Sequence, residues 1–180
     1  MKLFNPMIMD SLPRMKIWIG LFIASIVAGV VAYDTITPLL TPLFEITYAI
    51  VGNISFKEIN KIVTILAIFA KNALIALLCI LTARLTFGIY PGLIVALNGL
   101  LIGYVGVMLV SGGGLTALQV FGGIAPDGVL ELFGIFLACA IGFAKYPMKE
   151  KFRYSALVWI ALFGAAVIEA TITVMVVAMY

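Results

Sequence analysis

The hydrophobic residues of this chain fall into five long runs, separated by short segments that contain proline, glycine or charged residues. A helix that crosses a bilayer needs about 20 mostly apolar residues, and each run approaches that length. Because lipid offers no hydrogen-bond partners to the backbone, we expect an all-α polytopic transmembrane helix bundle forming one integral-membrane domain over residues 1–180. The predicted spans, about five in number, are residues 17–33, 62–83, 93–110, 129–144 and 155–178.

The segment between the first two runs is apolar but interrupted. Two prolines and Glu45 fall within residues 35–55, which favours an amphipathic or partly embedded external segment over a span. Ser55 is followed three residues later by Glu58, a spacing typical of a capping box at a helix start. We therefore expect the second long helix to begin at Phe56.

Glycine breaks the apolar segment at residues 111–125, between the third and fourth runs. Two structures fit it: an external loop, or a short re-entrant hairpin. The hairpin requires surrounding protein, because irregular backbone is not tolerated against lipid. We favour the loop, and we expect Pro126 and Gly128 to open the fourth span.

Composition supports a membrane protein, since 64% of the 180 residues are hydrophobic and 11% are charged. The mean hydropathy is +1.25. The net charge of +3 is better explained by topology than by nucleic-acid binding, because the basic residues flank alternate ends of the spans. The rule that cytoplasmic segments are basic then predicts a cell-membrane protein with its N-terminus inside and its C-terminus outside. The residues that carry this prediction are Lys2, Arg14, Lys16, Arg84, Lys145, Lys149, Lys151 and Arg153.

The basic start and apolar first run would also suit a signal peptide. Gly20, Ala24, Ala28 and Ala32, however, recur at four-residue spacing. Such a stripe lets a second helix approach closely, so it favours a retained and packed span.

The sequence contains few of the residues and motifs that enzymes and metal sites use. The chain has no histidine, which removes the commonest general base and metal ligand. Its two cysteines, Cys79 and Cys139, lie in predicted spans without metal-ligand spacing and are expected to be buried thiols. No nucleophile or phosphate-binding motif is present either. We predict no catalytic residues, no cofactor and no metal.

Several polar residues do lie within the predicted spans, where an unpaired charge would cost several kcal/mol in lipid. Lys71 and Glu169 are each about nine residues from the outer end of their spans, so we predict that they pair. Glu131 is expected above this pair, on a helix face shared with small residues. The predicted intramembrane polar cluster is Lys71, Asn72, Asn98, Glu131 and Glu169.

Two functions fit such a cluster. Buried polar groups often only fix how helices pack, as in an anchor or assembly scaffold. Inward carboxylates also suit a small transporter or channel subunit that would use Glu131, Glu169 and Lys71. In both cases the expected partners are the lipid bilayer and either further copies of the chain or other membrane proteins.

The chain resembles the stage II sporulation protein M family from about Phe69 to Thr173. The matching features are the Asn72 helix, the Asn98-Gly99 pair, Ile168-Glu169, and a motif made of Pro126, Asp127, Gly128 and Glu131, followed by Gly142. Members of the family usually carry histidine at the second position of this motif. Asp127 takes its place here, so any role of an imidazole is not carried over.

The resemblance implies a function as well as a fold. In spore-forming bacteria the family implies a membrane anchor or scaffold that holds peptidoglycan-remodelling partners during engulfment. Many relatives occur where no spores form. What the resemblance implies for this chain is therefore a membrane-embedded, non-enzymatic organiser of partner proteins.

Overall fold

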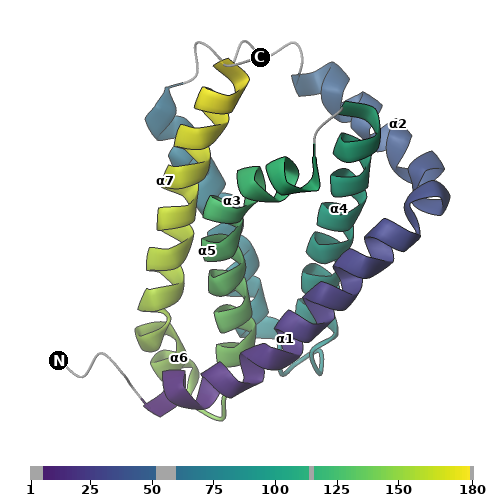
Figure 1. Cartoon of the computed structure of the whole chain (residues 1–180). Helices are drawn as coiled ribbons and strands as arrows, with labels where there is room; N and C mark the ends of the chain where they lie inside the picture. Colours follow the sequence, from purple (N-terminus) through teal and green to yellow (C-terminus); the bar gives the residue numbers. More distant parts are fainter. Residues whose placement is uncertain (1–5, 52–59, 114–115, 179–180) are drawn as a thin grey trace.

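The fold is known from a computed structural model, which describes residues 6–51, 60–113 and 116–178. All the regular elements in this part of the chain are helices, and the predicted all-α membrane bundle is confirmed (Figure 1). The helices are α1 (Pro6–Val31), α2 (Tyr33–Val51), α3 (Lys61–Thr82), α4 (Ile89–Gly113), α5 (Ala117–Phe143), α6 (Met148–Tyr154) and α7 (Ala156–Ala178).

Helix α5 forms the centre of the bundle. Every residue from Ile135 to Ile141 is buried, so this helix is covered on all sides. Helices α3 and α7 pack against it and against each other, and α1 also contacts it. In Figure 1 the upright part of α5 stands between α7 and α4, whereas its first turns lie sideways. The small and apolar residues from Ile135 to Ile141 therefore pack closely against the surrounding helices.

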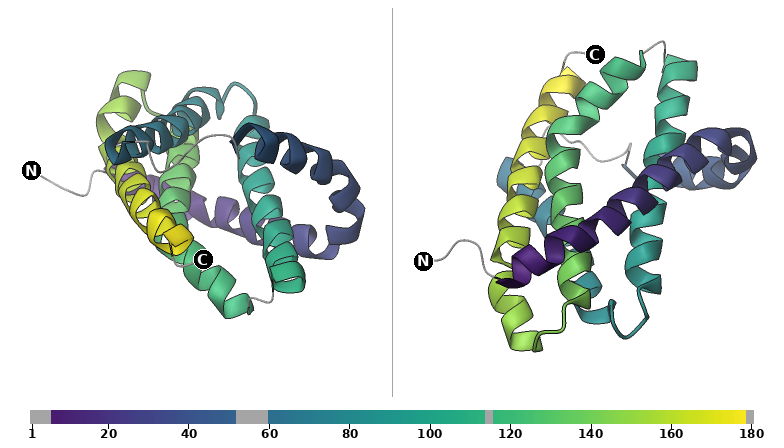
Figure 2. Two further views of the ribbon diagram at one scale, coloured as in Figure 1. Left: turned by 90° about the horizontal axis from the view of Figure 1, so that it is seen from above. Right: turned by 60° about the horizontal axis from the view of Figure 1, so that its bottom comes forward.

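Helix α1 crosses the bundle diagonally and joins α5 to α4 (Figure 2). Two contacts between aromatic rings hold it to α5. Trp18 lies 5.9 Å from Phe143 in a tilted arrangement, and Phe22 meets Phe136 edge to face at 5.5 Å, both measured between ring centroids. On the other side α1 meets α4 so closely that a side chain at Gly99 would come within 2.6 Å of the Phe22 carbonyl oxygen. The close approach between these two helices therefore depends on glycine.

In the part of the chain that the structure describes, three helices are long and apolar enough to cross a membrane by themselves: Met9–Val31 of α1, all of α3, and Ile89–Gly112 of α4. The bent pair of α6 and α7, which meet at 43°, would count as a fourth span. The central α5 contributes a shorter apolar helix, Gly128–Phe143. A count of about five spans is roughly compatible with this set.

Helix α2 follows α1 after one residue and occupies the interrupted segment. It contains Pro38 and Pro42 and still forms a helix of 19 residues. The ring of Tyr33, at its start, stacks on Tyr104 of α4 at 5.1 Å. This contact ties the junction of α1 and α2 to α4.

Two predicted boundaries are wrong. The described residues of the segment 111–125 are mostly helical instead of a loop, because α4 continues to Gly113 and α5 begins at Ala117; residues 114–115 lie outside the described part. A capping box starts α5: the Thr116 hydroxyl accepts a hydrogen bond from the Gln119 backbone, and the Gln119 side chain accepts one from the Thr116 backbone. Pro126 and Gly128 therefore lie inside α5 instead of opening it.

The starts of α3 and α1 also differ from the prediction. The described part of α3 begins at Lys61, where the Asn60 side chain caps it by accepting a hydrogen bond from the Ile62 backbone at 2.9 Å. The expected capping box of Ser55 and Glu58 lies outside the described residues. At the other end of the chain, α1 already begins at Pro6, before the predicted first span of residues 17–33.

Candidate functional site

Contacts among α3, α5 and α7 determine where the predicted polar residues lie along the axis of the bundle. The rings of Phe69 and Phe163 meet edge to face at 5.6 Å, which aligns α3 with α7. A side chain at Gly164 would lie 3.8 Å from Leu130, which aligns α7 with α5 at the same level. At the far end of α5, Gly142 packs against α3 residues near Cys79. Helices α3 and α5 therefore run in the same direction, and α7 runs in the opposite one.

The structure does not bring Lys71 and Glu169 together. Lys71 follows Phe69 by two residues and Glu169 follows Phe163 by six, in opposite directions along the bundle. At 1.5 Å per residue their backbones are separated by roughly 12 Å along the axis. The Lys71 side chain is also exposed on the outer face of α3, whereas one carboxylate oxygen of Glu169 is buried.

The two asparagines of the predicted cluster are in different surroundings. Asn98 is half-buried on α4, and its amide donates to the Ile94 carbonyl of its own helix at 2.8 Å. Asn72 is fully buried on α3, and within the described residues neither its amide nitrogen nor its amide oxygen has a hydrogen-bond partner. Leaving such a group unpaired costs about 1–3 kcal/mol. Asn72 is thus a costly polar residue of the core.

Glu131 is half-buried and next to Leu130, so it lies near the level of the Phe69–Phe163 contact. The order expected for the two acids is reversed, since Glu169 lies nearer the far end of the bundle than Glu131 does. The side chains of Pro126 and Asp127, in the same motif, lie outside the described residues.

The small-residue face that begins at Glu131 is the main packing surface of α5. A Cβ at Gly134 would come within 2.8 Å of Leu162 on α7, and a Cβ at Gly142 would come within 2.7 Å of the Cys79 carbonyl oxygen on α3. Ala138, between them, is fully buried. The face therefore works as predicted: it lets two neighbouring backbones approach α5.

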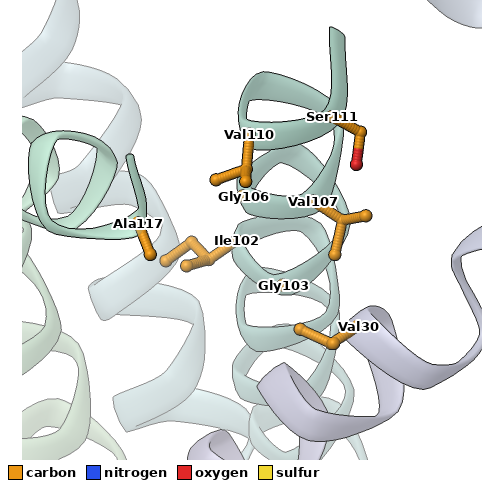
Figure 3. Close-up of a pocket in the computed structure, with 8 residues that line it drawn as sticks. All are labelled: Val30, Ile102, Gly103, Gly106, Val107, Val110, Ser111 and Ala117. Carbon is orange, nitrogen blue, oxygen red and sulfur yellow. The ribbon is translucent and has the colours of Figure 1, made fainter. Parts of the chain in front are cut away.

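An apolar cleft lies between α1, α4 and the start of α5 (Figure 3). Its volume is about 220 Å³. Gly103 at its base is covered by α1, whereas a Cβ at Gly106, one turn further along α4, would meet nothing within 4 Å. The residues that line it are Val30, Ile102, Gly103, Gly106, Val107, Val110, Ser111 and Ala117. The sequence did not indicate this opening, because it depends on where α1 crosses.

Comparison with known proteins decides the family. The family model of stage II sporulation protein M matches residues 18–174, which is most of the chain. The protein belongs to this family. No curated protein and no solved structure matches it. As a member of the stage II sporulation protein M family with several apolar helices, it is a multi-pass membrane protein.

The match to the stage II sporulation protein M family is longer than the sequence resemblance indicated. It begins at residue 18 instead of Phe69, so it includes most of α1 and all of α2. The crossing of α1 over α4 therefore falls within the region that defines the family. The cleft beside that crossing falls within it as well.

The charged segments of this stage II sporulation protein M relative meet at one end of the bundle. The Tyr146 hydroxyl, after α5, donates to the Asp10 carboxylate on α1 at 3.1 Å. This hydrogen bond raises the pKa of the Tyr146 phenol, because losing the proton would place two negative charges together. Lys151 of α6 is only 3% exposed, and its ammonium donates to the Gly142 carbonyl oxygen at 2.6 Å.

The described residues of this family member contain no group of three histidine, cysteine, aspartate or glutamate side chains that could hold a metal ion. Cys79 and Cys139 are free and buried thiols. They lie at the interface of α3 and α5, in contact with each other.

Proposed function

We propose that the protein is a membrane-embedded anchor or assembly scaffold that holds partner membrane proteins against its own helices. The observation that carries this proposal is the cleft between α1, α4 and α5. It is apolar, it opens at the helix surface, and its floor at Gly106 is free of side-chain contacts. The proposed role is non-enzymatic and uses no cofactor.

The occupant that suits the cleft is an apolar transmembrane helix of a partner protein. Helix α4 already binds one helix in this way, because Gly99 and Gly103 let α1 approach to backbone contact. Gly106 continues the same row beyond the point where α1 leaves it. Small residues in such a row favour helix association in lipid, where packing replaces the hydrophobic effect as the driving force. Peptidoglycan-remodelling membrane proteins are the partners that the family resemblance implies.

The buried framework supports the same role. Glycines at three helix contacts bring backbones together, and α5 is enclosed by α1, α3 and α7. A closely packed core of this kind resists deformation, so it presents a fixed surface to a partner. The alternative, a small transporter or channel subunit, would use Glu131, Glu169 and Lys71. The separation of Lys71 from Glu169 gives that alternative no support.

We also propose that the charged end of the bundle faces the cytoplasm. The contacts of Asp10 with Tyr146 and of Lys151 with Gly142 gather several basic segments at this end, and basic segments are retained inside the cell. A cysteine at the exposed position Lys149 should react with a membrane-impermeant reagent only after the membrane is opened. Labelling of intact cells would contradict this orientation.

Affinity purification with a matched pair of variants tests the scaffold. Gly106→Leu would place a side chain in the cleft at a position where an added Cβ meets nothing within 4 Å. Gly20→Leu places the same side chain at an equally open position on α1, outside the cleft. The protein would be tagged and extracted gently from its native membranes. Proteins that co-purify with it in stoichiometric amount would then be identified by mass spectrometry. We expect one membrane protein to co-purify with the native chain and with Gly20→Leu, and to be lost from Gly106→Leu.

The outcome is informative only if both variants remain folded, so their thermal unfolding is measured alongside. A partner that persists in folded Gly106→Leu would contradict the cleft as its binding surface. Recovery of further copies of the chain alone would show a homo-oligomer in place of a scaffold for other proteins.

A further inference from the structure

A second cavity lies at the charged end of the bundle, remote from the cleft. Its volume is about 440 Å³. It is formed where α3 ends, where α5 ends and where α6 begins. The residues that line it are Leu81, Arg84, Leu85, Gly142, Tyr146, Met148 and Lys151.

The charge of this cavity is entirely positive. Arg84 and Lys151 line it, and no acidic residue does. In the described part of the chain neither cation pairs with a carboxylate, and the Gly142 carbonyl accepts the one hydrogen bond that Lys151 donates. An ammonium has three protons to donate, so Lys151 retains donors for a ligand.

Burial makes one of these cations, Lys151, unusual. Lys151 is only 3% exposed, and Arg84 is close enough to act on it as a like charge. A buried charge is costly unless it is paired, and a second positive charge nearby adds to that cost. An anion in the cavity would offset both effects. Arg84 would supply the planar, multiple-donor contact that suits phosphate oxygens, and Lys151 would supply a compact charge.

We propose that this cavity binds a phosphate group, with Arg84 and Lys151 as its ligands. The surroundings favour a phosphate carried by an anionic phospholipid. The cavity lies at the ends of two apolar helices, α3 and α5, and its walls include Leu81, Leu85 and Met148 beside the cations. Basic pockets between membrane helices on the cytoplasmic side bind lipid head groups in this manner. The bound lipid would then also fix how deep this end of the bundle lies in the bilayer.

The test uses the full chain, delipidated in a neutral detergent and titrated with three probes. These are short-chain phosphatidylglycerol, short-chain phosphatidylcholine and inorganic phosphate, and the readouts are native mass spectrometry and thermal unfolding. We expect one bound phosphatidylglycerol, with at least tenfold weaker binding of phosphatidylcholine. Inorganic phosphate that raises the unfolding temperature and competes with the lipid would support the site and identify free phosphate as a second source of the ligand.

Two variants give this test its control. Arg84→Gln should weaken binding at least tenfold, whereas Lys149→Gln removes an equal charge from an exposed position outside the cavity and should change binding less than twofold. Arg84 is itself exposed, so its replacement should leave the fold intact even if Lys151→Met does not fold. Equal losses in both variants, or equal affinity for the two lipids without any binding of phosphate, would overturn the proposal.

Discussion

The ring of Phe69 on α3 meets the ring of Phe163 on α7 edge to face, with 5.6 Å between the centroids. This contact sets the relative height of two antiparallel helices in the core. It therefore decides which polar residues of α3 and α7 can meet. Lys71 and Glu169 are separated because of it.

Cysteine cross-linking tests this register. Phe69→Cys combined with Phe163→Cys should be joined by the shortest bifunctional thiol reagent, because the rings at these two positions are in contact. Lys71→Cys combined with Glu169→Cys should not, because their backbones are roughly 12 Å apart along the axis. Mass spectrometry of proteolytic fragments would identify the products, and the native cysteines are fully buried. Efficient cross-linking of the second pair would contradict the arrangement.

Gly142→Ala should destabilise the bundle. The added Cβ would lie 2.7 Å from the Cys79 carbonyl oxygen and 2.6 Å from the Ala83 Cβ, so α3 would have to move away from α5. Overpacking of this kind costs about 1–3 kcal/mol. The same change at Gly20, where nothing lies within 4 Å, should be neutral or slightly stabilising. Thermal unfolding in detergent compares the two, and equal stability would show that the helices are not held at this distance.

Asn72→Leu should raise the stability of the protein. The side chains are similar in size, and leucine removes two buried polar atoms that lack partners among the described residues. The expected gain is about 1–3 kcal/mol in the free energy of unfolding. Thermal unfolding measures it. A loss of stability would mean that the amide of Asn72 has partners in the membrane, such as bound water, and that the residue contributes to the fold.

Glu169→Gln separates the two functional hypotheses. A scaffold should keep its co-purifying partner, because the change removes a charge and keeps the shape of the side chain. A proton path through this carboxylate would instead lose pH-dependent flux in liposomes. We expect the partner to be retained and the flux of native and variant protein to be equal. A flux present only in the native chain would favour the transporter.

The sequence predicted the class of the fold and its central helix, because both depend on local pattern. The apolar runs indicated membrane helices, and the spacing of Gly134, Ala138 and Gly142 after Glu131 indicated a face for close packing. The extra helical turns before Pro126 were missed because glycine was given more weight than the Thr116-x-x-Gln119 pattern. That pattern is a capping box and was visible in the sequence.

Positions that depend on contacts between helices could not be predicted in the same way. Depth was estimated by counting from the ends of spans, which assumes that all helices begin at one plane. The contact of Phe69 with Phe163 shifts α7 relative to α3 and breaks that assumption. The cleft at Gly106 depends on the diagonal course of α1. The periodicity of hydrophobic residues does not predict the direction in which a helix crosses its neighbours.

Photo-cross-linking in native membranes tests the scaffold most directly. A photoreactive residue at Val110, which lines the cleft and is 41% exposed, would be compared with one at Val63, which is 56% exposed on α3 and outside the cleft. We predict that Val110 captures one transmembrane protein, that Gly106→Leu abolishes the capture, and that Val63 does not reproduce it. Capture of the same protein from both positions, or capture unaffected by Gly106→Leu, would contradict this prediction.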